Sequence, residues 1–362
     1  MSRTLRSLAF GTSLAALATT ALAEPSQELI DAAKAEGQLT TIALPHNWCG
    51  YGDLIAGFKA KYGLTVNELN PNAGSADELE AIKANIGNTG PQAPDVIDVG
   101  LSFGPAAKEQ GLIQPYKVST WDSIPADTKD ADGFWYGDYY GVLGFAVNKD
   151  VFPESPTSFA DLKDKQYANS LALPGDPRTG NSTMMTVITA GLAQGGEAGA
   201  DATEKGIAYF KGLKDDGILV PVNGSAQNLA QGTTPIYFDW DYNLLAMRDG
   251  LGGNPEVEIV IPSDGVLAGV YVQAISAHAP HPNAAKLWME YLYSDEGQLG
   301  WLKGYCHPVR FDDMMARGVI PQDVLDKLPA VPEGKTVFPT LDQQEAAKAT
   351  IAAKWAAEMG VQ

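Results

Sequence analysis

The chemically most suggestive stretch is residues 174–183, which reads PGDPRTGNST and directly follows an apolar run. Its two prolines and two glycines predict a tight loop, and Asn181 or Ser182 can cap a helix that begins there. The free N–H groups of such a helix start favour an anion, and Arg178 can hold a phosphate or carboxylate through two hydrogen bonds. An ordinary capped helix with a solvated Arg178 is the alternative. The candidate ligand-binding residues here are Arg178, Thr179, Asn181, Ser182 and Thr183.

A second stretch, residues 237–242, reads YFDWDY. If it is a strand, its two aspartates point to one side and its alternate aromatic residues to the other. A carboxylate beside aromatic faces suits an ammonium group through an ion pair and a cation–π contact. An aromatic core strand with a capping aspartate is the alternative. The candidates here are Asp239, Trp240, Asp241 and Tyr242.

Aromatic and polar residues also follow the first expected strand, in the sequence HNWCGY at residues 46–51. Trp48 or Tyr51 can stack on a ligand and Asn47 can hydrogen-bond to it. Two further candidates lie in loops or connecting segments, namely Ser102 and Tyr140.

These loops need a framework that brings them together. Short β-type runs alternate with helical patterns, which predicts parallel sheets with helices on both faces. Expected strands are 38–44, 65–69, 95–99, 142–148, 170–173, 235–240, 257–261 and 266–275, and expected helices include 53–62, 75–85, 182–192 and 202–213. Ligands of open α/β sheets bind beyond the carboxyl ends of strands, where most of these loops fall.

The expected strands at 142–148 and 266–275 are far apart in the sequence and can carry the chain out of one lobe and back. We therefore expect an α/β fold of two lobes with a hinge and a cleft between them. Lobe 1 is predicted to contain residues 24–142 and 264–362, and lobe 2 residues 143–263.

Composition limits the function classes. The 362 residues carry 25 Lys+Arg against 44 Asp+Glu, a net charge of -19, which argues against nucleic acid as a partner. With 45% hydrophobic residues the chain can form real cores. The sequence contains no G-x-S-x-G, H-E-x-x-H or P-loop pattern, so we expect no catalysis, and a secreted hydrolase is the alternative from another class.

The first residues are typical of an export signal. Arg3 and Arg6 precede an apolar stretch at 8–18, and Ala-Leu-Ala at 21–23 offers small residues to a signal peptidase. We expect residues 1–23 to be a signal peptide cleaved before Glu24, and the mature protein to be soluble in an oxidising compartment.

Several segments together resemble one family. They are DVID at 95–98, GLIQPY at 111–116, HPNAAKLW at 281–288, SDEGQ at 294–298 and PVR at 308–310. This pattern is similar to that of solute-binding proteins of bacterial ABC importers, in the subgroup that binds ferric iron, polyamines, sugar phosphates or aminophosphonates. The resemblance implies a hinged, monomeric periplasmic protein without a cofactor, whose partners are a small charged solute and the membrane subunits of a permease.

The resemblance also bears on the ligand. Anion-binding members of the family use a small polar loop at the place of residues 174–183, whereas polyamine binders place an acid and an aromatic near the place of 237–242. Ferric-iron binders usually have two adjacent tyrosines there, which this sequence lacks. An anion cradle combined with an acid and aromatics suggests a small zwitterion such as 2-aminoethylphosphonate, and a polyamine or a sugar phosphate is the alternative.

The two cysteines, Cys49 and Cys306, both fall in segments that the family topology brings to the lobe 1 rim of the cleft. In an exported protein two cysteines favour a single disulfide. Two buried free thiols are one alternative, and a zinc site that adds His46 and His307 is another. We expect the disulfide and no metal.

Overall fold

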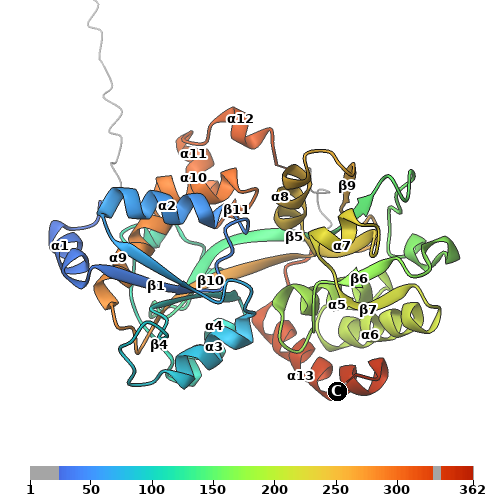
Figure 1. The fold of residues 1–362 in the computed structure, drawn as a ribbon. Helices are drawn as coiled ribbons and strands as arrows, with labels where there is room; N and C mark the ends of the chain where they lie inside the picture. The colour runs from blue at the N-terminus through green and yellow to red at the C-terminus, as the bar shows by residue number, and fades with distance from the viewer. Residues whose placement is uncertain (1–23, 329–335, 362) are drawn as a thin grey trace, which may run out of the picture.

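The computed structural model describes residues 24–328 and 336–361, so the predicted signal peptide lies outside the described residues. The chain folds into two bodies (Figure 1), and two long strands, β5 (Tyr136–Asn148) and β10 (Ala268–Ser276), run through the region between them. All thirteen residues of β5 except Tyr140 are buried, as are all nine of β10. This burial on both faces explains why both strands read as nearly continuous apolar runs.

The first body is built from the segments before β5 and after β10. Before β5 its elements are α1 (Gln27–Glu36), β1 (Gln38–Ile42), α2 (Tyr51–Tyr62), β2 (Thr65–Leu69), α3 (Ser75–Ala84), β3 (Val96–Gly100), α4 (Phe103–Glu109), β4 (Ile113–Gln114) and the short turns Trp121–Ser123 and Ala126–Thr128. After β10 come α9 (Pro282–Leu292), α10 (Asp295–Lys303), β11 (His307–Pro308), α11 (Phe311–Arg317) and α12 (Gln322–Leu325). Helix α9, which contains most of the family-like segment 281–288, packs its apolar face into the core, where Leu287 and Trp288 are fully buried.

The second body holds the segment between the two long strands. It contains the turns Asp161–Lys163 and Lys165–Tyr167, then β6 (Leu171–Leu173), α5 (Asn181–Ala193), α6 (Ala200–Asp215), β7 (Leu219–Asn223), α7 (Ala226–Ala230), β8 (Ile236–Trp240), α8 (Asp241–Leu251) and β9 (Val257–Val260). Helices α5 and α6 cross closely because Gly191 and Gly206 leave no side chain between them. A Cβ on Gly206 would lie 1.9 Å from the Val187 carbonyl oxygen.

The main sheet is mixed, which corrects the prediction of parallel sheets. Its strands run in the order β3-β10-β5-β8-β6-β7, and β10 pairs with β3 and β5 in antiparallel fashion, as β5 does with β8. Among the named strands that the structure describes, β1 pairs in parallel with β2, and β6 pairs in parallel with β7 and β8. The reason for the difference is that the chain crosses between the bodies in opposite directions along β5 and β10, which forces these neighbours to be antiparallel.

The last helix, α13 (Leu341–Met359), was not among the predicted elements. It lies beneath the second body (Figure 1), where it packs on α6 and α5. Its first half also reaches the first body, since Lys348 Nζ donates to the Ser102 carbonyl at 3.0 Å. The proposed lobe boundaries stay a prediction, with the qualification that α13, assigned to lobe 1 from sequence, contacts mostly helices of the other body.

Candidate functional site

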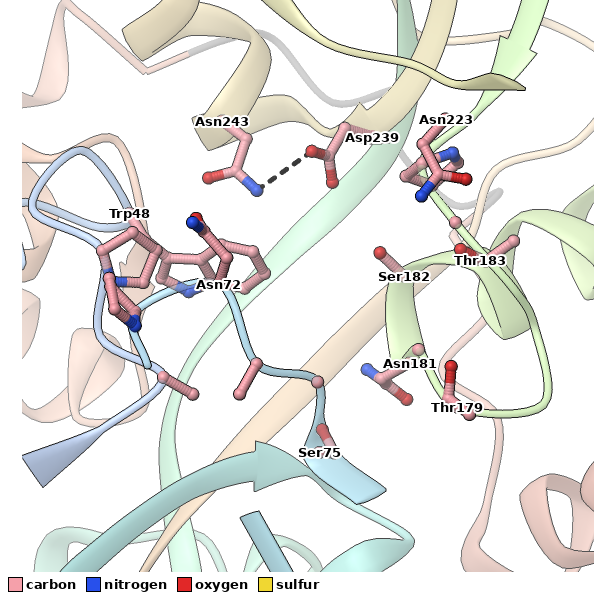
Figure 2. Close-up of a pocket in the computed structure, with 18 of the residues that line it drawn as sticks. Trp48, Asn72, Ser75, Thr179, Asn181, Ser182, Thr183, Asn223, Asp239 and Asn243 are labelled. Carbon is pink, nitrogen blue, oxygen red and sulfur yellow. Dashed lines mark hydrogen bonds between the residues drawn. The ribbon is translucent and has the colours of Figure 1, made fainter. Parts of the chain in front are cut away.

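A cleft of about 530 Å³ lies where the two bodies meet (Figure 2). The first body contributes the loop after β1, the start of α3 and the end of β3, and the second body the start of α5 and the end of β8. The side chains that dominate it are Asn47, Trp48, Asn72, Ser75, Asp98, Thr179, Asn181, Ser182, Thr183, Asn223, Asp239 and Asn243. Seven of the predicted site residues are therefore brought together, namely Asn47, Trp48, Thr179, Asn181, Ser182, Thr183 and Asp239. Their contact with a ligand stays a prediction.

Trp48 is held rigidly in the first wall. Its indole Nε1 donates to the Tyr139 hydroxyl at 2.6 Å, and its ring packs edge-on against Tyr242 and Tyr271, with centroids 5.4 and 5.5 Å away. Next to it, Cys49 has a φ of 47° and forms a disulfide with Cys306. A flat ring fixed in this way offers a stacking surface without losing side-chain entropy on binding.

The start of α5 forms part of the second wall. Its N-cap is Gly180, and no side chain caps it, so the prediction that Asn181 or Ser182 would cap the helix is wrong. Both residues instead belong to the first helical turn. Because no side chain competes for them, the N–H groups of this turn are available to a solute, and the helix dipole makes the position favourable for an anion.

Asp239 is the acid at the end of β8. It is 8% exposed and accepts hydrogen bonds from the Tyr237 hydroxyl at 2.6 Å, the Trp240 N–H at 2.8 Å and the Asn243 amide at 3.2 Å (Figure 2 shows the last). Burial raises the pKa of Asp239 above its ordinary value, because the charged form loses hydration there. A cationic group beside Asp239 would restore the lost stabilisation of the carboxylate.

The charge of the cleft is one-sided. Its described lining includes five acids, Asp77, Glu78, Asp98, Asp176 and Asp239, and no lysine, arginine or histidine. Arg178, expected to grip an anion, does not line the cleft; its guanidinium pairs with Asp176, with Nη2 to Oδ2 at 2.6 Å. This pairing lowers the pKa of Asp176.

Six further predicted residues lie elsewhere. Tyr51 is buried and donates to Asp98 at 2.8 Å, and Ser102 is buried at the first turn before α4. Tyr140, next to Tyr139 on β5, stacks on His307 and lines a second cavity instead of the cleft.

The alternation expected for residues 237–242 breaks at Trp240, because β8 ends there and α8 begins at Asp241. Asp241 therefore turns away from Asp239 and accepts the Val142 N–H at 3.0 Å. Trp240 and Tyr242 are fully buried, over Gly269 and Gly141 respectively, where a Cβ would lie 2.3 Å from each ring. None of these three residues lines the cleft. They belong to the buried core beneath it.

Several lining residues were not named as candidates from the sequence, among them Asn72, Asp98, Asn223 and Asn243, although the loops 70–75 and 238–243 were expected at the ligand edge of the sheets. Asp98 carried a signal, because it is the one polar side chain in the apolar strand β3. Asn243 lies in the first turn of α8, four positions after Asp239, and this placement becomes visible once α8 is known to begin at Asp241.

Across the cleft the two bodies touch at glycines. A Cβ on Gly100 would lie 2.3 Å from Cγ of Asn181, and one on Gly74 would lie 3.0 Å from the Thr179 carbonyl oxygen. These two contacts join the end of β3 and the start of α3 to the loop and helix start of the second body. The absence of side chains on both glycines allows this approach.

The cysteine prediction is confirmed, since Cys49 and Cys306 are bridged. The zinc alternative is thereby removed, because both thiols are consumed, and His46 contacts Glu68 while His307 stacks on Tyr140. Within residues 24–328 and 336–361, no group of three or more His, Cys, Asp or Glu side chains is arranged to hold a metal ion. Over the same residues, no helix combines the length and apolar character of a membrane span.

The fold is that of two-lobed periplasmic binding proteins. The periplasmic binding protein AfuA of Actinobacillus pleuropneumoniae, solved with fructose 6-phosphate, aligns over 90% of this chain and 99% of its own with a TM-score of 0.71 and 22% identity. Iron-bound HitA of Pseudomonas aeruginosa aligns over 90% and 99% with a TM-score of 0.64 and 18% identity. A spermidine/putrescine ABC transporter protein of Listeria monocytogenes aligns over 89% and 99% with a TM-score of 0.66 and 14% identity.

Comparison of the amino-acid sequence identifies the family. Residues 92–342 match the family model for bacterial extracellular solute-binding proteins, and the chain belongs to that family. A curated relative, the probable ABC transporter periplasmic-binding protein y4fP of Sinorhizobium fredii (strain NBRC 101917 / NGR234), is 25% identical over 199 residues, which are 54% of this chain. The matched region spans about half, 53%, of that relative's length.

Proposed function

We propose that the protein is the periplasmic solute-binding component of an ABC importer and that it captures a small solute carrying a positive charge. Our best candidate is an aminophosphonate such as 2-aminoethylphosphonate. The observation that carries the proposal is that the second-body wall of one cleft presents both an uncapped helix start at α5 and the buried carboxylate of Asp239. A zwitterion satisfies both ends at once.

Capture proceeds by closure of the lobes about β5 and β10. A solute that touches Trp48 on one wall and Asp239 on the other stabilises the closed arrangement, because it contacts both lobes only there. The membrane subunits of the permease then recognise the closed protein, which acts as a monomer and leaves the solute chemically unchanged. A turnover of 2-aminoethylphosphonate by the purified protein would contradict this and favour the hydrolase alternative.

A polyamine is the second candidate. The specific observation in its favour is the set of five acids in the cleft lining, which no described basic side chain of that lining offsets. A sugar phosphate is less well served, because it has no ammonium group to pair with Asp239 and because Arg178 is already paired to Asp176.

A thermal-shift screen tests these candidates directly, since a ligand present at 100 times its Kd stabilises the folded state by about 2.7 kcal/mol. We expect 2-aminoethylphosphonate to raise Tm most, putrescine or spermidine less, and fructose 6-phosphate or ferric citrate not at all. Asp239→Asn should abolish the shift, whereas Asp216→Asn, which changes an exposed acid of the second body, should leave it intact. Stabilisation by fructose 6-phosphate or ferric citrate alone would contradict the proposal.

A further inference from the structure

The second cavity, which Tyr140 lines, has a volume of about 600 Å³. It has no lining residue in common with the solute cleft, although strand β10 contributes to both. Tyr271 of β10 lines the cleft, whereas Ala268 and Val270 line the second cavity. A volume of this size falls in the range of small-molecule sites in proteins. Solute capture in the cleft leaves this second space unused.

Two backbone hydrogen bonds fix one wall of the second cavity. The Ala268 N–H donates to the Val337 carbonyl at 2.9 Å, and the Val337 N–H donates to the Val266 carbonyl at 2.9 Å. They tie the segment before α13 to the start of β10. The next residue, Phe338, lines the cavity and is 50% exposed. Its position is therefore set by the backbone, while much of its ring is free to contact a ligand.

Aromatic rings cluster around this wall. Tyr140 stacks on His307 with ring centroids 4.8 Å apart, and it lies edge-on to Phe338 at 5.6 Å. Phe311, which also lines the cavity, contacts His307 at 5.8 Å. Burial lowers the pKa of His307 to about 4, so this ring adds no positive charge at neutral pH. Aromatic faces attract apolar groups and cations alike.

Three acids accompany the aromatic rings. Asp127, Asp312 and Asp342 line the cavity, and all three are exposed, so they belong to its rim. None of them has a hydrogen bond or an ion pair within the part of the chain that the structure describes. The described lining also contains no lysine, arginine or histidine. The cavity therefore combines an apolar interior with negative charge that no lining base offsets.

A buried acceptor belongs to the same wall. Gln344, in the first turn of α13, lines the cavity and is 1% exposed. Its Nε2 donates to the Pro339 carbonyl at 2.9 Å, whereas its Oε1 has no hydrogen-bond partner among the described residues. A buried carbonyl oxygen without a donor costs free energy, which a ligand N–H group would relieve. This observation is independent of the rim acids and points to a ligand that donates hydrogen bonds.

We propose that the second cavity binds a small organic ammonium ion with an apolar body, of which phenethylammonium is an example. The apolar body packs against Phe311 and Phe338, and the ammonium group pairs with the rim acids Asp127, Asp312 and Asp342. An anion would be repelled by these acids, and a polyamine would leave the aromatic lining unused. The inference does not rest on the proposed function, because the two sites share no lining residue.

Calorimetric titration of the protein with phenethylammonium tests the site. The neutral 2-phenylethanol and the anionic 3-phenylpropionate have a similar apolar body and serve as comparison ligands. We expect phenethylammonium to bind at least about tenfold more tightly than 2-phenylethanol, a difference that shrinks as salt is added, and 3-phenylpropionate not to bind. Absence of phenethylammonium binding, or binding of 3-phenylpropionate with equal affinity, would overturn the proposal.

Variants of the lining separate the two parts of the site. Phe338→Ala should weaken phenethylammonium at least about fivefold, because it removes part of the aromatic lining. The triple variant Asp127→Asn/Asp312→Asn/Asp342→Asn should lower the affinity for phenethylammonium to that for 2-phenylethanol and leave the alcohol unaffected. All four side chains are exposed, so we expect both variants to fold, which far-UV circular dichroism checks. Asp216→Asn is the matched control and should bind like the unmodified protein.

Asp239→Asn distinguishes the second cavity from the solute cleft. The cleft also contains acids and the ring of Trp48, so a cation can in principle enter it. We expect Asp239→Asn to bind phenethylammonium within about twofold of the unmodified protein, since Asp239 does not line the second cavity. Loss of binding in Asp239→Asn, with full binding in the triple variant, would place the cation in the cleft and overturn the second site.

Discussion

Gly100 and Asn181 meet across the cleft, from β3 of the first body and α5 of the second. The Cβ that alanine would add at Gly100 would lie 2.3 to 2.7 Å from the atoms of the Asn181 amide, which is itself 3% exposed and has little room to retreat. The glycine thus permits the approach of the two walls that a trapped solute requires.

Gly100→Ala should therefore hold the walls apart. Overpacking of this kind costs about 1–3 kcal/mol, so solute affinity should fall on the order of tenfold or more, and small-angle scattering should show less compaction with ligand. Gly212→Ala is the matched control, because its added Cβ meets nothing within 4 Å on the exposed face of α6. An affinity of Gly100→Ala equal to that of the control would show that the contact does not limit closure.

The Cys49–Cys306 bridge should contribute strongly to stability, because it closes a loop across a sequence separation of 257. In the chain-entropy view we expect the double variant Cys49→Ser/Cys306→Ser to lose about 3–5 kcal/mol of unfolding free energy. Urea denaturation under oxidising conditions measures the loss. Its solute affinity should also drop, since the bridge fixes the loop that carries Trp48; a loss of stability with full affinity would separate the two roles.

Arg178→Ala should leave solute affinity within about twofold, because the guanidinium is engaged by Asp176 and does not line the cleft. The sequence alone favours the opposite result, a clear loss for an anionic solute. Titration calorimetry with 2-aminoethylphosphonate distinguishes the two, and a loss of tenfold or more would mean that Arg178 swings to the solute on binding.

Asp241 should make stability depend on pH. Burial raises its pKa to about 7 in the folded protein, against an ordinary value of about 3.9. Its protonated form is therefore favoured on folding, so its stabilising effect is present below about pH 4 and is lost as the pH rises through about 7. In urea denaturation, Asp241→Asn should reduce the change of unfolding free energy between about pH 4 and about pH 7, by at most about 4 kcal/mol. The Asp216→Asn control should show the same pH dependence of stability as the unmodified protein. If Asp241→Asn also shows that same pH dependence, Asp241 does not cause it.

The sequence predicted the fold class, most strand and helix positions and about half of the candidate site. It succeeded where one local rule decides the outcome, as for the loop and helix start at residues 174–183. The strand predicted through residue 242 is wrong at Asp241 and Tyr242, because an alternating pattern does not reveal that the strand ends at Trp240 and that a helix begins at Asp241.

Side-chain and strand partners explain the other differences between the sequence predictions and the structure. Arg178 looks available in the sequence, yet Asp176 lies two residues earlier and occupies it through a bidentate pair. The sheet is antiparallel around β5 and β10 because of how the chain crosses between the bodies, and no local pattern encodes that direction. Asp98 was interpreted as an interruption of a strand, since its hydrogen-bond partners Tyr51 and Tyr139 lie on other elements, more than 40 positions away in the sequence.

The order in which the chain is made gives the Cys49–Cys306 bridge a further consequence. Cys49 precedes Cys306 by 257 of the 362 positions, so the bridge cannot form until that intervening part of the polypeptide has been synthesised. The loop that carries Trp48 is thus synthesised early, but the disulfide can fix it only after residue 306 has been synthesised.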